Sequence, residues 1–204
     1  MKRRQALKIT TIGAIGLSAS ISSSCSKNTY SFNHGVASGD PLEDRVILWT
    51  RVTPQQAGPV EAILEISEDE NFSKIAYSKK LRTSSLSDYT IKYDFLAKQY
   101  CDSDKGFFYR FRAGSSISEI GKSKTFSKNT VSAKIGVFSC SNFPAGYFNA
   151  YQAAAEKNDL DLWLHLGDYL YEYPMGGYAT DNAEKLGRTP NPEHEMITLS
   201  DYRQ

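Results

Sequence analysis

The chain has 204 residues, of which 40% are apolar and 23% are charged, and its formal net charge is +1. These values are typical of an ordinary soluble globular protein with room for one large domain or two small ones. Part of the positive charge is in Lys2, Arg3, Arg4 and Lys8. We therefore expect the rest of the chain to be near neutral and to lack a basic face that binds nucleic acid.

The first 28 residues have the pattern of an export signal. Residues 2–8 are positively charged, and residues 9–21 form a mildly apolar stretch that is too short for an ordinary membrane span. The Arg3-Arg4 pair resembles a twin-arginine signal, which the Tat translocase recognises. Cys25 follows a serine run and is a candidate for lipidation, as in bacterial lipoproteins. We expect an exported protein that is periplasmic, extracellular or lipid-anchored at the outer surface.

Residues 29–131 have an all-β pattern. Short runs rich in β-branched and aromatic residues, several with period-two alternation, predict strands at 46–52, 60–66, 89–95 and 107–112. Turn-rich segments separate these runs. The spacing predicts an antiparallel β-sandwich domain of the immunoglobulin or fibronectin kind, a fold that hosts many functions and indicates none by itself.

The pattern changes in residues 132–204. Residues 135–138 predict a buried strand, residues 147–157 a helix, and residues 160–166 a second strand. A right-handed crossover makes such strands parallel and places their carboxyl ends side by side. One strand pair with one helix does not cover both faces of a parallel sheet, so we expect the beginning of a larger α/β domain.

The last part of the chain gives weaker signals. Residues 181–192 are polar and we expect them to be exposed. Residues 198–204 resemble the opening turn of a helix with Thr198 or Ser200 as its cap.

Residues of types that are able to bind metals follow both predicted strands of residues 132–204. Cys140 follows the first strand and Asp168 the second, and the carboxyl ends of neighbouring strands face one crevice. Tyr171 lies three residues after Asp168, so one helical turn would bring both to the same side. A thiolate, a carboxylate and a phenolate suit ferric iron better than zinc or magnesium, because magnesium disfavours sulfur and only a strongly Lewis-acidic ion holds a phenolate near neutral pH.

Other interpretations of these residues stay open on pattern alone. A cysteine after an apolar strand is more often a small buried hydrophobe than a ligand, and a Gly-Asp pair is often only a turn. His165 is expected to be a packed, hydrogen-bonded histidine, and Cys101 a structural or incidental loop thiol. His34 and His194 have no evident partner. A further hypothesis makes Cys140 a nucleophile with His165 as its base.

Four separated motifs carry a resemblance to a known family. They are NHGVASGDP at 33–41, VILWTRV at 46–52, FSCSN at 138–142 and HLGDYLYEY at 165–173, and TLSDYR follows at 198–203. In this order they resemble the motifs of the PhoD-like alkaline phosphatase/phosphodiesterase family. The match runs from about residue 31 to the last residue. Residues 99–106 depart from the family pattern, which usually has a proline-containing turn there.

The resemblance implies an N-terminal immunoglobulin-like domain followed by a calcineurin-like metallophosphoesterase domain. Its cofactors would be Fe(III) and Ca²⁺, with Cys140, Asp168 and Tyr171 as iron ligands and Asp168 as the catalytic residue nearest both ions. The activity would be that of a hydrolase acting on phosphate monoesters or diesters outside the cytoplasm. The family's remaining ligands would lie after residue 204, so we expect these 204 residues alone to be inactive or nearly so. An exported, non-catalytic β-sandwich binding protein with a degenerate α/β tail is the alternative.

Overall fold

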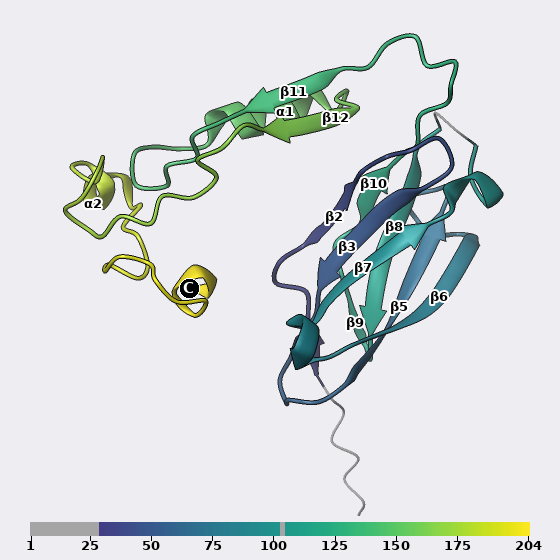
Figure 1. Ribbon diagram of the computed structural model, residues 1–204, viewed down its shortest axis with the longest axis horizontal. Helices are drawn as coiled ribbons and strands as arrows, with labels where there is room; N and C mark the ends of the chain where they lie inside the picture. Colours follow the sequence, from purple (N-terminus) through teal and green to yellow (C-terminus); the bar gives the residue numbers. More distant parts are fainter. Residues whose placement is uncertain (1–28, 103–104) are drawn as a thin grey trace, which may run out of the picture.

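A computed structural model describes residues 29–102 and 105–204 of the chain. The expectations for a leader at 1–28 and for lipidation of Cys25 fall outside these residues. Most of the regular secondary structure in the described residues is β-strand, with a few short helices (Figure 1). Within the described ranges, no helix combines the length and the apolar character needed to cross a membrane.

Two antiparallel sheets form the first part of the chain, which we call the two-sheet region (residues 29–127). One sheet has the order β2-β3-β7, and the other has the order β10-β8-β5-β6 with β9 beside β8. Their bounds are β2 Val36–Gly39, β3 Val46–Arg51, β5 Val60–Ser67, β6 Ile75–Thr83, β7 Thr90–Phe95, β8 Phe107–Ala113, β9 Ser116–Ile117 and β10 Gly121–Ser123. Strands β1 (Tyr30–Ser31) and β4 (Thr53–Pro54) pair separately, and 3-10 turns occupy Ser85–Ser87 and Ala97–Gln99.

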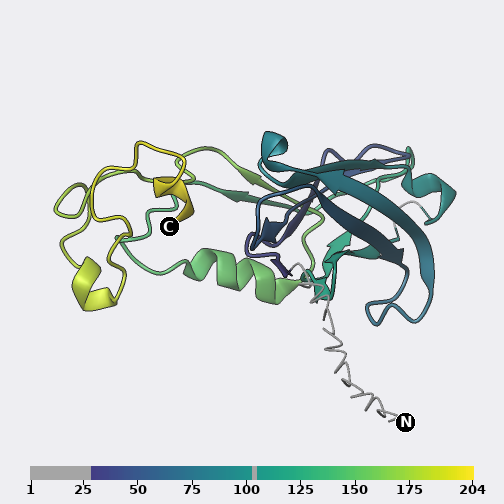
Figure 2. The same cartoon turned by 90° about the horizontal axis from the view of Figure 1, so that it is seen from below.

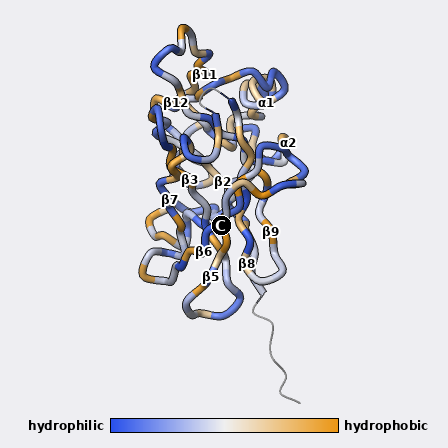
Figure 3. The backbone as a smooth tube through the Cα atoms, turned by 90° about the vertical axis from the view of Figure 1, so that its right-hand side faces the viewer, coloured by the Kyte–Doolittle hydropathy of each residue, from blue (hydrophilic) through white to orange (hydrophobic). Residues whose placement is uncertain are grey.

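The core between the two sheets is formed by every second side chain of the strands. In β8 the side chains of Phe107, Tyr109 and Phe111 are buried while the residues between them are half-buried, and β3 repeats this pattern. Figure 3 shows that apolar and polar residues both occur along the backbone of the two-sheet region. Side chains from β3, β5, β7 and β8 form one hydrophobic cluster. Complete burial of each large apolar side chain contributes about 1.5–3 kcal/mol to folding, so this cluster stabilises the region.

The sequence predicted four of the strands in these two sheets and missed β2, β6, β9 and β10, of which β6 is the longest. Residues 46–52, 60–66, 89–95 and 107–112 are strands with bounds shifted by about one residue at an end. Strand β6 lies at the edge of its sheet, where it pairs only with β5. It carries Lys79, Lys80 and Arg82, which are exposed. Charged side chains are usual on edge strands because they oppose pairing with another chain. In β6 they interrupt the period-two alternation of apolar and polar residues by which a strand is predicted.

The α/β part has the predicted order. Strand β11 (Ile135–Phe138) pairs in parallel with β12 (Leu162–His165), and helix α1 (Asn149–Lys157) lies between them in the chain. The helix begins two residues later than predicted, and the second strand is shorter at both ends. The expectation of a buried strand at 135–138 was wrong, because this part of the described chain supplies only two strands with one helix between them, and residues of both strands stay exposed. Helix α1 lies on one side of the strand pair (Figure 2), where the ring of Tyr151 packs on Phe138 with centroids 4.8 Å apart.

Two expectations for the last segment were wrong in part. Residues 181–192 are not uniformly exposed, because helix α2 (Ala183–Leu186) buries Ala183 completely, and Pro190 and Pro192 are also buried. The turn at 198–204 is a single 3-10 turn (Asp201–Arg203) rather than the start of an α-helix. No side-chain cap bond comes from Ser200, whereas Thr198 Oγ1 accepts from the Asp201 amide at 3.4 Å.

Ion pairs connect the two-sheet region to the α/β part. Asp88 is shared by two guanidinium groups, that of Arg51 in β3 and that of Arg203 in the last turn. Lys124, which follows the two sheets, pairs with Asp161 just before β12. The Arg203–Asp88 pair ties the end of the described chain to the two-sheet region, and the Lys124–Asp161 pair ties the segment just before β12 to it.

Candidate metal centre

The segments that follow β11 and β12 continue to pair after the strands end. Three backbone amides donate across the gap: Leu166 N to Phe138 O at 2.8 Å, Cys140 N to Gly167 O at 3.1 Å, and Ser141 N to Asp168 O at 2.8 Å. The parallel pairing therefore extends to Cys140 and Asp168. The expectation that these residues lie side by side is confirmed.

The three candidate ligands meet at one oxygen atom. Cys140 Sγ donates to Asp168 Oδ2 at 3.4 Å, and Tyr171 Oη donates to the same oxygen at 3.1 Å. Donor atoms that share one small cation, with bonds of about 2.0–2.3 Å, lie roughly 3 Å apart. The separations therefore fit a shared ion, and once deprotonated the three groups supply three negative charges, which suits a trivalent cation.

A site here depends on the tyrosine. Within residues 29–102 and 105–204, no group of three or more His, Cys, Asp and Glu side chains is placed to hold a metal ion. Hydrogen bonding with Cys140, burial, and the neighbouring Asp168 all raise the pKa of Tyr171. The Tyr171 phenol is therefore protonated at neutral pH in this structure. A bound cation would replace its proton and that of Cys140 as the electrostatic partner of the carboxylate.

The backbone at the site differs from the expected helical turn. Cys140 and Asp168 have φ angles of 59° and 52°, in the left-handed region. Residues 169–173 form no helix, so Tyr171 reaches Asp168 from an irregular segment. Left-handed conformations of residues other than glycine cost on the order of 1–3 kcal/mol and persist only where the surroundings hold them.

His165 is hydrogen-bonded, as the sequence indicated. Its Nε2 lies 3.0 Å from Ser141 Oγ and 2.9 Å from Tyr151 Oη, and its Nδ1 lies 3.4 Å from the amide nitrogen of Gly167. Ser141 and Tyr151 are also hydrogen-bonded to each other. These partners do not include the Cys140 thiol, which bonds Asp168, so the geometry does not support a Cys140–His165 nucleophile and base pair. The sequence did not predict Ser141 and Tyr151 as partners of His165, because only the folded chain brings these three separate segments together.

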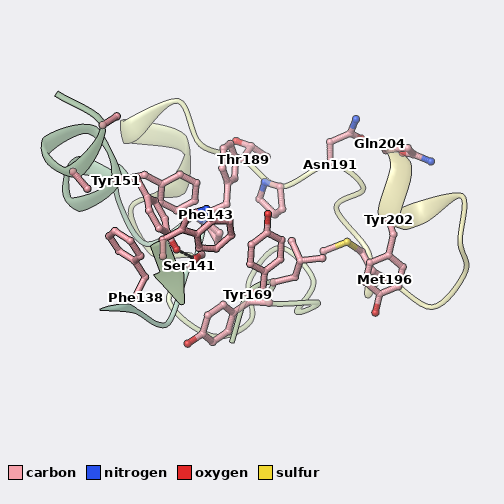
Figure 4. Close-up of a pocket in the computed structure, with 18 of the residues that line it drawn as sticks. Phe138, Ser141, Phe143, Tyr151, Tyr169, Thr189, Asn191, Met196, Tyr202 and Gln204 are labelled. Atoms are coloured by element: carbon pink, nitrogen blue, oxygen red, sulfur yellow. Dashed lines mark hydrogen bonds between the residues drawn. The ribbon is translucent and has the colours of Figure 1, made fainter. Parts of the chain in front are cut away.

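A large apolar cavity of about 860 Å³ borders the cluster. Tyr171 lies in its wall, and Figure 4 shows the aromatic side chains around it, among them Phe138, Tyr169 and Tyr202. An apolar cavity beside a small group of polar side chains is the usual form of a ligand site. The sequence did not predict this cavity, because residues from several separate segments line it.

Arg188 fixes the segment after Cys140 against the later part of the chain. Its Nε donates to the carbonyl oxygen of Phe143 at 2.6 Å, and its guanidinium lies 3.8 Å from the centroid of the Phe143 ring. In the described part of the chain, Arg188 Nη2 and both polar side-chain atoms of Asn142 are buried without a hydrogen-bond partner.

The other described cysteine, Cys101, and the histidines His34 and His194 have different surroundings from the cluster. Burial, together with nearby acidic residues, raises the pKa of the Cys101 thiol to about 11, as expected for a structural thiol packed against the core. His194 has a partner after all, because its Nε2 lies 3.6 Å from Asp201 Oδ1. Burial and the neighbouring guanidinium groups of Arg51 and Arg203 lower the pKa of His34.

The chain is similar to known proteins over both the two-sheet region and the α/β part. Residues 18–127 match the model of the PhoD-like phosphatase N-terminal domain, and residues 135–204 match that of PhoD-like phosphatase. Alkaline phosphatase D of Bacillus subtilis (strain 168) is 37% identical over 190 residues, which are 86% of this chain and 31% of that protein. A solved structure described as PhoD superposes with a TM-score of 0.71 at 35% identity and covers 83% of this chain and 33% of the other. The chain thus spans about a third of the length of these relatives.

Proposed function

The chain belongs to the PhoD-like phosphatase family, and on this premise we propose that it contributes a metal centre to the hydrolysis of phosphate esters. The centre would be built on Cys140, Asp168 and Tyr171. The observation that carries the proposal is the convergence of a thiol and a phenol on one carboxylate oxygen, inside the segment that matches the phosphatase model.

The proposed domains follow the change in architecture. Residues 29–131 would be an immunoglobulin-like β-sandwich, which is supported by two antiparallel sheets around one core. Residues 132–204 would be the N-terminal part of a calcineurin-like metallophosphoesterase domain, which is supported by the parallel pair β11–β12.

The proposed cofactors are Fe(III) and Ca²⁺. Cys140, Asp168 and Tyr171 would hold the ferric ion, whose preference for hard anionic oxygen fits two of these donors. Both hydrogen bonds in the cluster end on Oδ2 of Asp168, and Oδ1 takes part in neither, which leaves it able to face the second ion. When bound, the ions would stabilise charge on the phosphoryl group and provide a hydroxide nucleophile at moderate pH.

The chain's own side chains would prepare the site in two ways. Cys140 and Tyr171 would each release a proton when the metal binds, so binding should strengthen as pH rises. The aromatic walls of the adjoining cavity would exclude water from one side of the cluster and contact the organic part of a substrate. Monoesters and diesters of phosphate both remain candidates.

The proposal includes export by the Tat translocase and action outside the cytoplasm, with Cys25 as the point of lipid attachment. It also includes inactivity of these 204 residues alone. It is supported by the described residues, among which no group of three or more His, Cys, Asp and Glu side chains is placed to hold a metal ion.

Substitution of Asp168 tests the proposal in the intact protein. Asp168→Asn keeps the shape of the side chain but removes the negative charge, and should lower turnover of p-nitrophenyl phosphate and bis(p-nitrophenyl) phosphate by about 100-fold or more. Asp181→Asn, at an exposed aspartate, is the matched control. Unchanged turnover in Asp168→Asn would sink the assignment. A colourless, metal-free and inactive wild-type protein would instead fit an exported, non-catalytic binding protein.

A further inference from the structure

One imidazole ring connects the two segments that carry the candidate ligands. Through Nε2, His165 bonds Ser141, the residue after Cys140, and through Nδ1 it bonds the amide of Gly167, the residue before Asp168. His165 itself is half-buried at the end of β12. Each of these two bonds thus ends on a residue that is adjacent in the sequence to a candidate ligand.

The hydrogen-bond directions in this network follow from the chemistry of the groups. A backbone amide can only donate, so the contact with Gly167 N makes Nδ1 an acceptor. In the neutral ring Nε2 then carries the proton and donates toward the hydroxyls of Ser141 and Tyr151. A nitrogen that donates to Ser141 does not remove its proton, so this trio is suited to holding a structure rather than to activating a nucleophile.

The segments on either side of His165 need such support. Cys140 and Asp168 both have left-handed backbones, which relax unless neighbouring contacts hold them. The two backbone bonds between the segments, Cys140 N to Gly167 O and Ser141 N to Asp168 O, are at the exposed end of a sheet with only two strands. Tyr151 adds a fixed point on helix α1, where its ring lies 4.8 Å from that of Phe138.

We propose that His165 is a positioning residue that holds Cys140 and Asp168 at the separation required for metal binding. It acts through Ser141 and Tyr151 on one side and through the Gly167 amide on the other. This inference rests on the proposed function for the identity of the ligands. The arrangement of the two segments is a property of the metal-free chain and can be measured separately.

The first experiment measures amide hydrogen exchange in the intact, metal-free protein. His165→Phe keeps a ring that can pack on Tyr151 and Tyr169 but removes both nitrogens. The amides of Cys140 and Ser141 should exchange at least about tenfold faster in this variant, because the segments that they join separate more often. Amides of the central strand β5 should be unchanged. His34→Phe, at an exposed histidine of the two-sheet region, should leave all of these amides unchanged.

The second experiment measures ferric binding by the visible tyrosinate-to-iron absorption band. His165→Phe should weaken ferric binding by about tenfold or more, as changes next to metal ligands usually do. His165→Gln replaces the Nε2 donor, and His165→Asn replaces the Nδ1 acceptor. Each should recover part of the lost affinity and of the amide protection, which a purely space-filling role would not produce.

The outcomes separate the two proposals. Exchange at Cys140 and Ser141 that is the same in His165→Phe and wild type would overturn the positioning role. The positioning role would also be overturned if His165→Gln and His165→Asn behaved like His165→Phe in both experiments. The same holds if His165→Phe unfolds and the Gln and Asn variants unfold as well. A wild-type protein that binds no iron, with faster exchange in His165→Phe, would reject the proposed metal centre but keep His165 as the residue that joins the segments.

Discussion

The Sγ atom of Cys140 lies 3.4 Å from Oδ2 of Asp168, although 28 residues separate them in the chain. Tyr171 donates to the same oxygen from 3.1 Å. One carboxylate oxygen therefore accepts both available protons of the cluster. Substitution of Tyr171 and chemical modification of Cys140, the two groups that donate to this oxygen, provide direct tests of the site.

Removal of the Tyr171 hydroxyl should remove the colour of the ferric protein. Tyr171→Phe keeps the ring, whose centroid lies 6.1 Å from that of Tyr178, but deletes the donor oxygen. We expect the visible charge-transfer band to disappear and the ferric affinity to fall by about tenfold or more. Tyr173→Phe, two residues further on and exposed, should keep the band. A Tyr171→Phe protein with the wild-type spectrum would exclude a tyrosinate ligand at this position.

The two described thiols should differ in reactivity. Cys140 is exposed, whereas Cys101 is half-buried and has a pKa raised to about 11, chiefly by burial. Because the thiolate is the reactive form, iodoacetamide at pH 8 should modify Cys140 well before Cys101 in metal-free protein. Loading with ferric iron should then protect Cys140 selectively. Mass spectrometry of the alkylated peptides measures both results, and a Cys140 that is alkylated equally fast with iron present would contradict its role as a ligand.

The last turn should lose stability in strongly acidic solution. Bonds from the amides of Thr198 and Ile197 lower the pKa of Asp201 to about 2, below the ordinary value of 3.8. A carboxyl whose folded pKa is depressed stabilises the fold above its unfolded pKa, and that stability is lost as pH falls through the folded pKa. We expect an NMR titration of the Asp201 carboxyl carbon to have its midpoint near pH 2. A midpoint at the ordinary value would show that these amide bonds do not form in solution.

The core of the two-sheet region should be sensitive to the loss of a single side chain. Leu64 lies in the central strand β5 and is completely buried. Leu64→Ala should lower the free energy of unfolding by about 2–5 kcal/mol, because it removes buried methyl groups and leaves a cavity. Ile117→Ala, at a side chain that is 52% exposed, should change it by less than about 0.5 kcal/mol. Urea unfolding of both variants measures the difference, and equal values would mean that β5 is not at the centre of the core.

The sequence was most informative where one local pattern decides the structure. Alternation in β3 and β8 identifies the buried side chains, because each strand has one face toward a common core. The meeting of Cys140 with Asp168 could be predicted because strands joined by a helix are parallel and their ends lie side by side. The edge strand β6 could not be found in this way, since its exposed charges serve solvation rather than packing.

The details that complete the site depend on contacts between distant residues. The left-handed backbone of Cys140 has no signature in its residue type, and that of Asp168 has only a weak one, because aspartate is enriched in this region but usually adopts other conformations. The partners of His165 come from three segments, and only the folded chain brings Ser141 and Tyr151 to its ring. The mutual position of such groups cannot be inferred from spacing, because it is set by how α1 and the strand pair pack.

The left-handed conformation of Cys140 and Asp168 also bears on how this chain could change by mutation. Glycine adopts such a backbone without steric cost, so Cys140→Gly or Asp168→Gly would relieve strain on the order of 1–3 kcal/mol at the mutated position. Either change would delete a donor atom of the cluster. Selection for thermostability alone, for instance in a directed-evolution experiment without an activity screen, would therefore not preserve these two side chains.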